Sequence, residues 1–161
     1  LAYWIFTRAG APQVDFEWSF PDSPLRLDAV VTTASGDRIG LDFTMSSPYS
    51  SSNLRRASTP AILESLEARK HAHYDAAVAS LQAPMRFVPF ALLTSGRLGP
   101  AARALIHSQA ARLASAQGIP VALAEQRLTT QVSFTVVRQV AYSVLVRRPG
   151  FLDVAPEHGP R

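Results

Sequence analysis

The chain has 161 residues, which suits one domain, and 47% of them are hydrophobic, which is enough for a buried core. It contains no cysteine, and this excludes a disulfide framework, a zinc–thiolate site and thiol catalysis. The net charge of +4 and the pI of about 10.1 favour a polyanionic partner. No run approaches the roughly 20 apolar residues of a membrane span, so we expect no membrane partner.

Residues 13–20 favour a short strand, because aromatic and β-branched residues alternate there with polar ones. Asp15 and Glu17 share one face of this strand and are candidates for a further acidic ligand. A solvated sheet edge is the ordinary alternative for both. The next four residues, Pro-Asp-Ser-Pro at 21–24, are typical of a turn.

Residues 25–46 predict two strands around a turn, and each strand carries one carboxylate, Asp28 or Asp42. Period-two alternation places both carboxylates away from the main apolar surface. In the first strand that surface is expected to carry Leu25, Leu27, Ala29 and Val31. Opposed residues share a face, so a three-residue or bulged turn, with Gly36 at positive φ, would set Asp28 opposite Asp42 or Thr44.

Two carboxylates in that register would serve one divalent cation, because Mg²⁺ favours one or two carboxylates together with water and phosphate oxygens. An ordinary surface hairpin with solvated Asp28 and Asp42 is the alternative, since any solvated strand face looks similar.

The rest of the chain predicts a helix, a strand and two further helices. The first helix has Ser58 or Thr59 as its N-cap and Pro60 in its first turn. The apolar run 87–94 fits a buried strand, and its Pro89 requires an edge or a bulge because proline has no N–H. The later helices are expected over 101–117, closed by Gly118 and Pro120, and over 121–147.

Lys70 is the only lysine among sixteen basic residues, and it falls on or beside the core-facing side of the first helix. Glu67 and Tyr74 flank it at helical spacing. An ammonium at the edge of a core commonly extends to water, which is the alternative to a functional role.

Arg26, beside the first strand's carboxylate, and Arg55 and Arg56, in the Ser-rich connection 46–59, are candidate contacts for nucleic-acid phosphates. A solvated loop pair is the alternative for Arg55 and Arg56.

The order of these elements predicts an α/β (α+β) fold: a small mixed sheet built on a β-hairpin, a crossover helix and a third strand, flanked by helices. We expect a single domain over 1–147 with its core at 21–118, and a flexible tail or linker over 148–161.

A strand aspartate, a hairpin turn, a second strand aspartate and a helix that carries a lysine at the edge of the core together resemble the PD-(D/E)xK core. This core occurs in the restriction-like endonuclease domains attached to reverse transcriptases in non-LTR retrotransposons. The stretches that carry the resemblance are LRLDAVV, LDFTMSSP, LEARKHAHY and FVPFALLTSGRLGPAARALI, and they span roughly residues 25–110. Two positions depart from the pattern, because Leu27 precedes the first acid in place of proline and Leu93 stands where a glutamate is expected.

The resemblance implies a restriction-endonuclease-like core and an Mg²⁺-dependent endodeoxyribonuclease, with Mn²⁺ as a substitute. Asp28 and Asp42 would hold the metal, Lys70 would act on the attacking water, and Thr44, Glu67 and Tyr74 would support them. Glu17, Asp22 and Glu67 are the candidates for a further acidic ligand of the metal, and the sequence does not choose among them.

The resemblance also implies DNA as substrate, a reverse transcriptase domain of the same polyprotein as partner, and an intracellular location, nuclear in a eukaryote. The nick would prime reverse transcription during insertion of a retroelement. The two departures keep an alternative open, a catalytically inactive module of the same fold that binds nucleic acid or a neighbouring domain. A purely structural domain is a third possibility.

Overall fold

The computed structural model describes residues 6–7, 13–21, 23–54 and 58–146 of the chain. Their elements are, in order, β1 (Gln13–Ser19), β2 (Arg26–Thr32), β3 (Arg38–Ser46), α2 (Thr59–Ala79), β4 (Met85–Leu93), α3 (Pro100–Gln117) and α4 (Val121–Val146). The strands form one sheet in the order β1-β2-β3-β4. The first two pairings are antiparallel and the last is parallel, which confirms the predicted mixed sheet and its crossover helix.

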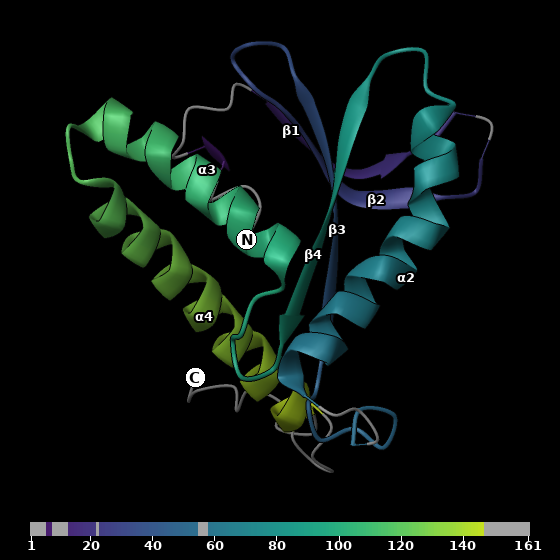
Figure 1. Cartoon of the computed structure of the whole chain (residues 1–161), viewed down its shortest axis with the longest axis vertical. Coiled ribbons are helices and arrows are strands. Elements are labelled where there is room, and N and C mark those ends of the chain that lie inside the picture. Colours follow the sequence, from purple (N-terminus) through teal and green to yellow (C-terminus); the bar gives the residue numbers. More distant parts are fainter. Residues whose placement is uncertain (1–5, 8–12, 22, 55–57, 147–161) are drawn as a thin grey trace, which may run out of the picture.

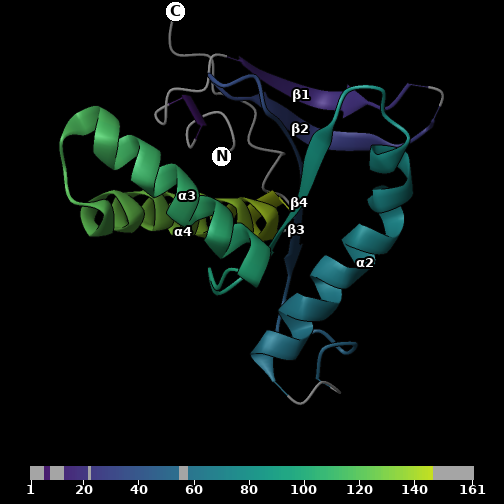
Figure 2. The same cartoon turned by 45° about the horizontal axis from the view of Figure 1, so that its top comes forward.

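The sheet is covered on both faces, by α2 on one side and by α3 and α4 on the other (Figure 1). Figure 2 shows β1 and β2 running across the top of the molecule, beyond the end of α2. The larger hydrophobic cluster joins the sheet to α3 and α4, and smaller ones join it to α2. The buried side chains of the larger cluster include Leu41, Phe90, Leu105, Ile106 and Leu128.

The turn between β2 and β3 has the predicted form. The Thr33 N–H donates to the Asp37 carbonyl at 2.9 Å, and the Gly36 N–H donates to the Thr33 carbonyl at 2.9 Å. Gly36 has φ +85°, which glycine adopts without a steric penalty. The three residues 34–36 therefore form a bulged loop of odd length, and the register Ala29 to Leu41 brings Asp28 and Asp42 to neighbouring positions.

The prediction that Leu27 and Ala29 share a face is wrong. Leu27 packs in a cluster under α2, whereas Ala29 packs in the cluster under α3 and α4. The strand is irregular at Asp28, between them: Glu17, its neighbour in β1, has φ +51°, and the Phe43 N–H donates to the Asp28 side chain. The regular ladder is interrupted there, so the period-two rule does not carry across Asp28.

The crossover through α2 begins and ends close to the predicted residues. Ser58 is the N-cap, in extended conformation, and its side chain accepts the Ala61 N–H at 3.4 Å. Strand β4 starts at Met85, two residues before the predicted 87. Because β4 is the last strand of the sheet, Pro89 lies on an edge strand, as expected for a residue without an N–H.

The two C-terminal helices are those predicted. Gly118, with φ +63°, closes α3, and α4 buries the i, i+4 series Ala124, Leu128, Val132 and Val136. Within the described residues no helix is long and apolar enough to cross a membrane. The expected tail, 148–161, lies outside the described residues.

Candidate functional site

Asp42 is the centre of the candidate site, and its environment differs from the prediction. It was expected away from the apolar surface, yet only 4% of the residue is exposed, because α2 covers this face of β3. Lys70 Nζ lies 2.6 Å from Asp42 Oδ2, and the Tyr74 hydroxyl donates to Asp42 Oδ1 at 2.8 Å. Oδ2 accepts no hydrogen bond within the described part of the chain, so its contact there is the ion pair with the Lys70 ammonium.

Helical spacing explains how α2 supplies both partners. Lys70 and Tyr74 are four residues apart and therefore lie on the same face of the helix. The Tyr74 ring packs against Phe20 and Phe87, with centroid distances of 6.1 and 5.1 Å. Lys70 Nζ lies 5.9 Å from the centroid of the same ring, so one aromatic side chain contacts both the carboxylate and the ammonium.

The Tyr74 hydroxyl also lies 2.9 Å from the Arg26 carbonyl, so it bridges β2 and β3. Burial raises the pKa of Tyr74 well above 10, and the hydrogen bond and negative charge of Asp42 raise it further. A phenol that holds its proton remains a donor to the carboxylate through the neutral pH range.

Asp28 stands next to this group on the neighbouring strand. It is exposed, and its Oδ2 accepts the Phe43 N–H at 2.6 Å, directly beside Asp42 in sequence. The described residues include no group of three or more His, Cys, Asp or Glu side chains suited to a metal. A cation held here by protein carboxylates would thus have Asp28 and Asp42 as ligands and water or phosphate oxygens elsewhere, a set that Mg²⁺ accepts.

Glu67 does not join the site. Its carboxylate accepts the Ala101 N–H at 3.0 Å and so satisfies a donor in the first turn of α3. Burial raises the pKa of Glu67, and the hydrogen bond from Ala101 opposes this shift. In the structure its contact is with a helix end and not with Asp28 or Asp42.

The remaining supporting residue, Thr44, lies two residues after Asp42 and pairs with Ala91 of β4. It is half-buried, and its hydroxyl makes no hydrogen bond within the described residues. Alternation places it on the face that carries Asp42, but the contacts of Asp42 come from α2.

The other predicted site residues either make contacts elsewhere or lie outside the described residues. Glu17 forms an exposed ion pair with Arg26 at 3.3 Å, and Asp15 accepts hydrogen bonds from Gln13. Asp22, Arg55 and Arg56 lie outside the described residues. Arg26 reaches the site through its carbonyl, which approaches Tyr74, and not through its guanidinium.

Two residues beside Lys70 were missed at the sequence level. Arg69 and His73 line a hollow of about 350 Å³ together with Lys70, and both are exposed. The His73 ring meets the Tyr74 ring edge-on at 4.7 Å. Their spacing in the helix was the available signal, since residues 69, 70 and 73 lie close together on a helical surface.

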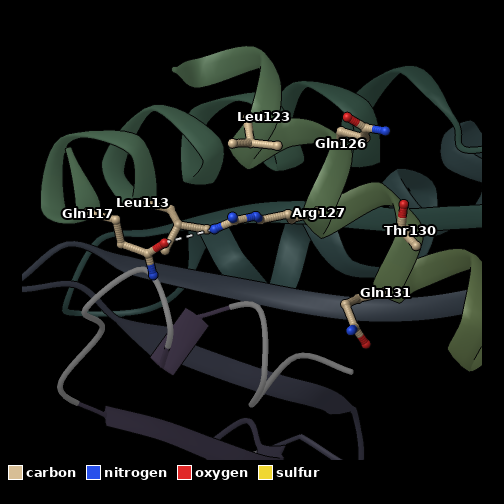
Figure 3. A pocket seen from close by; sticks show the side chains of 7 residues that line it. All are labelled: Leu113, Gln117, Leu123, Gln126, Arg127, Thr130 and Gln131. Carbon is tan, nitrogen blue, oxygen red and sulfur yellow. Dashed lines mark hydrogen bonds between the residues drawn. The ribbon is translucent and has the colours of Figure 1, made fainter. Parts of the chain in front are cut away.

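A different hollow, of about 550 Å³, lies between α3 and α4 (Figure 3). It is lined by Leu113, Gln117, Leu123, Gln126, Arg127, Thr130 and Gln131. Arg127 donates to the Gln117 side chain at 3.4 Å, as Figure 3 shows. None of these residues belongs to the group around Asp42.

Comparison with protein-family models, with curated proteins and with solved structures finds no match to this chain.

Proposed function

We propose that the chain is a metal-dependent DNA endonuclease with a restriction-endonuclease-like core. The observation that carries this proposal is the ion pair of 2.6 Å between Lys70 and Asp42. The sole lysine of the chain reaches a buried strand carboxylate from the following helix, which is a variation on the usual pattern, where the lysine lies two residues after the second acid, at the position of Thr44.

In this proposal Asp28 and Asp42 hold one Mg²⁺, which would polarise the scissile phosphate and activate a water molecule. Lys70 orients the attacking water and offsets negative charge on the phosphate, since a cation at the site of developing charge stabilises the transition state. Tyr74 fixes the Asp42 carboxylate through its hydrogen bond to Oδ1. The setting within a retroelement, with a reverse transcriptase domain that extends the nicked strand, rests on the resemblance alone.

The test is cleavage of plasmid DNA with Mg²⁺ or Mn²⁺, measured together with DNA affinity in the absence of metal. We expect Asp42→Ala to abolish cleavage and to leave DNA affinity largely intact. Because Asp42 is buried, Asp28→Asn serves as a second variant at an exposed position and should also abolish cleavage.

Asp75→Asn is the matched control, since Asp75 is an exposed carboxylate of α2 whose contact is His71. It should cleave as the wild type does. Cleavage by a folded Asp28→Asn variant at the wild-type rate would refute the assignment of the metal site.

An inactive nucleic-acid-binding module is the second candidate. It is favoured by the contacts that both oxygens of Asp42 already make with Tyr74 and Lys70. This candidate predicts DNA binding without metal-dependent cleavage in the wild type, so the same pair of assays separates the two.

A further inference from the structure

Helix α4 carries a second apolar stripe, on the side that faces away from the core. The residues that it buries include Leu128, Val132 and Val136, which pack in the larger hydrophobic cluster. Two positions along an α-helix point about 200° apart, because one turn takes 3.6 residues. Phe134 lies between Val132 and Val136, two positions from each, so it points away from the core, and 64% of the residue is exposed.

This outer stripe has the spacing of a coiled-coil contact. We call it the α4 seam, and it consists of Thr130, Phe134, Val137, Ala141 and Val144. The intervals between them alternate between four and three residues, as between the a and d positions of a heptad. All five residues are at the surface, and the exposed fractions of Val137 and Val144 are 64% and 65%. An apolar stripe of this length, left uncovered by the described part of the chain, is typical of a contact surface.

The α4 seam continues into the hollow between α3 and α4 that Figure 3 shows. Thr130 lines this hollow, and so does Leu123, which lies one heptad before Thr130 and is partly exposed. Leu113 of α3 adds an apolar side chain to the opposite wall. The surface from Leu123 to Val144 is about 32 Å long at 1.5 Å per residue, so it can accept a helix of about three heptads.

The charges left free beside the α4 seam are positive. Helix α4 has three charged residues, Glu125, Arg127 and Arg138. The Glu125 carboxylate contacts the His107 ring of α3 at 2.9 Å, whereas neither arginine forms an ion pair within the described residues. Arg127 lies three residues before Thr130, in line with the seam, and Arg138 flanks it. A helix packed on the seam would therefore meet two unpaired guanidinium groups.

We propose that the α4 seam docks an amphipathic helix of a partner protein, whose own apolar seam is flanked by acidic residues. Apolar side chains at heptad spacing interlock with those of another helix, which explains the exposed stripe. Acidic flanks on the partner would pair with Arg127 and Arg138 and select that partner. A second copy of this chain fits less well, because it would bring two more arginines to the contact.

This proposal is independent of the nuclease function. Helix α4 lies on the side of the sheet opposite α2, which carries Lys70 (Figure 2). A helix docked on α4 therefore leaves the group around Asp42 uncovered.

The test uses two synthetic peptides of about three heptads, both with isoleucine at a and leucine at d. One peptide has glutamate at the flanking e and g positions, and the other has lysine there. Fluorescence anisotropy measures the affinity of each labelled peptide for the full chain. We expect the glutamate peptide to bind about tenfold more tightly at low salt, and the difference to shrink as salt screens the exposed charges.

Variants of α4 locate the contact. The double variant Phe134→Ala, Val137→Ala truncates two exposed side chains, so it should fold, and it should weaken binding of the glutamate peptide about tenfold or more. Tyr142→Ala is the matched control, because Tyr142 is an exposed aromatic residue of α4 outside the seam, and it should bind as the wild type does. The double variant Arg127→Gln, Arg138→Gln should lose the preference for glutamate over lysine.

Three results would overturn the proposal. The first is a glutamate peptide that does not bind the wild type, or that binds the folded Phe134→Ala, Val137→Ala variant equally well. The second is equal affinity for the two peptides, which would refute an acidic partner. The third is a wild-type dimer in sedimentation that the same double variant makes monomeric, since a second copy would then occupy the seam. None of these results depends on cleavage, so the nuclease proposal stands or fails separately.

Discussion

Lys70 and Asp42 form an ion pair whose two members differ in exposure, since 21% of the lysine side chain is exposed and 6% of the aspartate side chain. Removing the lysine would leave a buried carboxylate without its charge partner, and such a loss costs more than the interaction itself contributes. The pair is thus a stability determinant as well as a candidate catalytic group.

We expect Lys70→Met to lower the free energy of unfolding by roughly 1–3 kcal/mol, because the apolar stem is kept and only the charge is lost. The double variant Lys70→Met, Asp42→Asn should recover part of that loss. Urea unfolding of the wild type, the two single variants and the double variant measures the coupling. Additive single effects would mean that the two groups do not interact.

Tyr74 gives a separate prediction, because its hydroxyl contacts two acceptors, Asp42 Oδ1 and the Arg26 carbonyl. Tyr74→Phe should cost roughly 1–3 kcal/mol, since it leaves the buried Asp42 Oδ1 without its hydrogen-bond donor. The raised pKa means that the folded state holds the phenolic proton where the unfolded state has lost it. The contribution of Tyr74 is therefore complete below pH 10 and decreases as the pH rises above it.

The measurement is urea unfolding of the wild type and Tyr74→Phe at neutral and alkaline pH. The difference in stability should narrow above pH 10. A difference that stays constant across the alkaline range would show that the hydroxyl is not held in its protonated form.

At the scale of elements, a side chain of α2 caps the start of α3. Glu67 of α2 accepts the Ala101 N–H at the start of α3, whose N-cap, Gly99, makes no capping bond of its own. A Cβ at Gly99 would collide with Glu67 Oε1, so the absence of a side chain there makes room for the carboxylate.

We expect Glu67→Ala to cost about 1 kcal/mol, the usual value of a helix cap. Because burial raises the pKa of Glu67, the protonated form is favoured in the folded state. The stability of the wild type relative to Glu67→Gln should therefore be greatest below pH 4.5, the ordinary value, and fall as the pH rises through the folded pKa.

Urea unfolding from acid to neutral pH checks this prediction. Gly99→Ala provides the control, since it displaces the same carboxylate without removing it. Its effect should be smaller in a Glu67→Ala background than in the wild type. An opposite slope with pH would show that the charge, and not the proton, is preferred at this helix end.

The sequence patterns were enough to predict most of the helices and strands, because interactions between neighbouring residues determine where these elements begin and end. Ser58 and Pro60 marked the start of α2, Gly36 marked the bulged turn, and Pro89 marked an edge strand. These signals act within a few residues of where they occur. The helical periodicity of 121–146 also prevailed over its strand propensity, since α4 buries one continuous stripe.

The site was harder to predict, because its contacts join residues distant in sequence. The pattern correctly put Lys70 beside the core, but it did not foresee that α2 would bury Asp42. Period-two alternation assigns faces and does not say which face a later helix covers. The irregularity at Asp28, which breaks that alternation, depends on Glu17 and Phe43 of the two flanking strands.

At the scale of the whole molecule, a metal bound between Asp28 and Asp42 would stabilise the folded state, because the unfolded chain has no such site. At a free Mg²⁺ concentration one hundred times its Kd, the gain would be about 2.7 kcal/mol. We expect thermal or urea unfolding midpoints to rise with Mg²⁺ or Mn²⁺ in the wild type and to stay unchanged in Asp28→Asn. The same rise in that variant would show that the ion acts elsewhere.

The parallel pairing of β3 with β4 has a consequence for how the protein folds. Strands β1, β2 and β3 are joined by short turns, whereas β4 pairs with β3 only after the whole of α2 has intervened. Pairing two strands that are distant in sequence costs loop-closure entropy before any contact between them forms. We therefore expect the three-stranded meander to be structured in the folding transition state and the pairing of β4 with β3 to follow. Substitutions in the β2–β3 hairpin should then give higher φ-values than substitutions in β4, and the reverse order would contradict this sequence of events. The contacts of Asp42 with Lys70 and Tyr74 of α2 would accordingly form late, so hydrogen-exchange protection of this part of the sheet would report on late folding events.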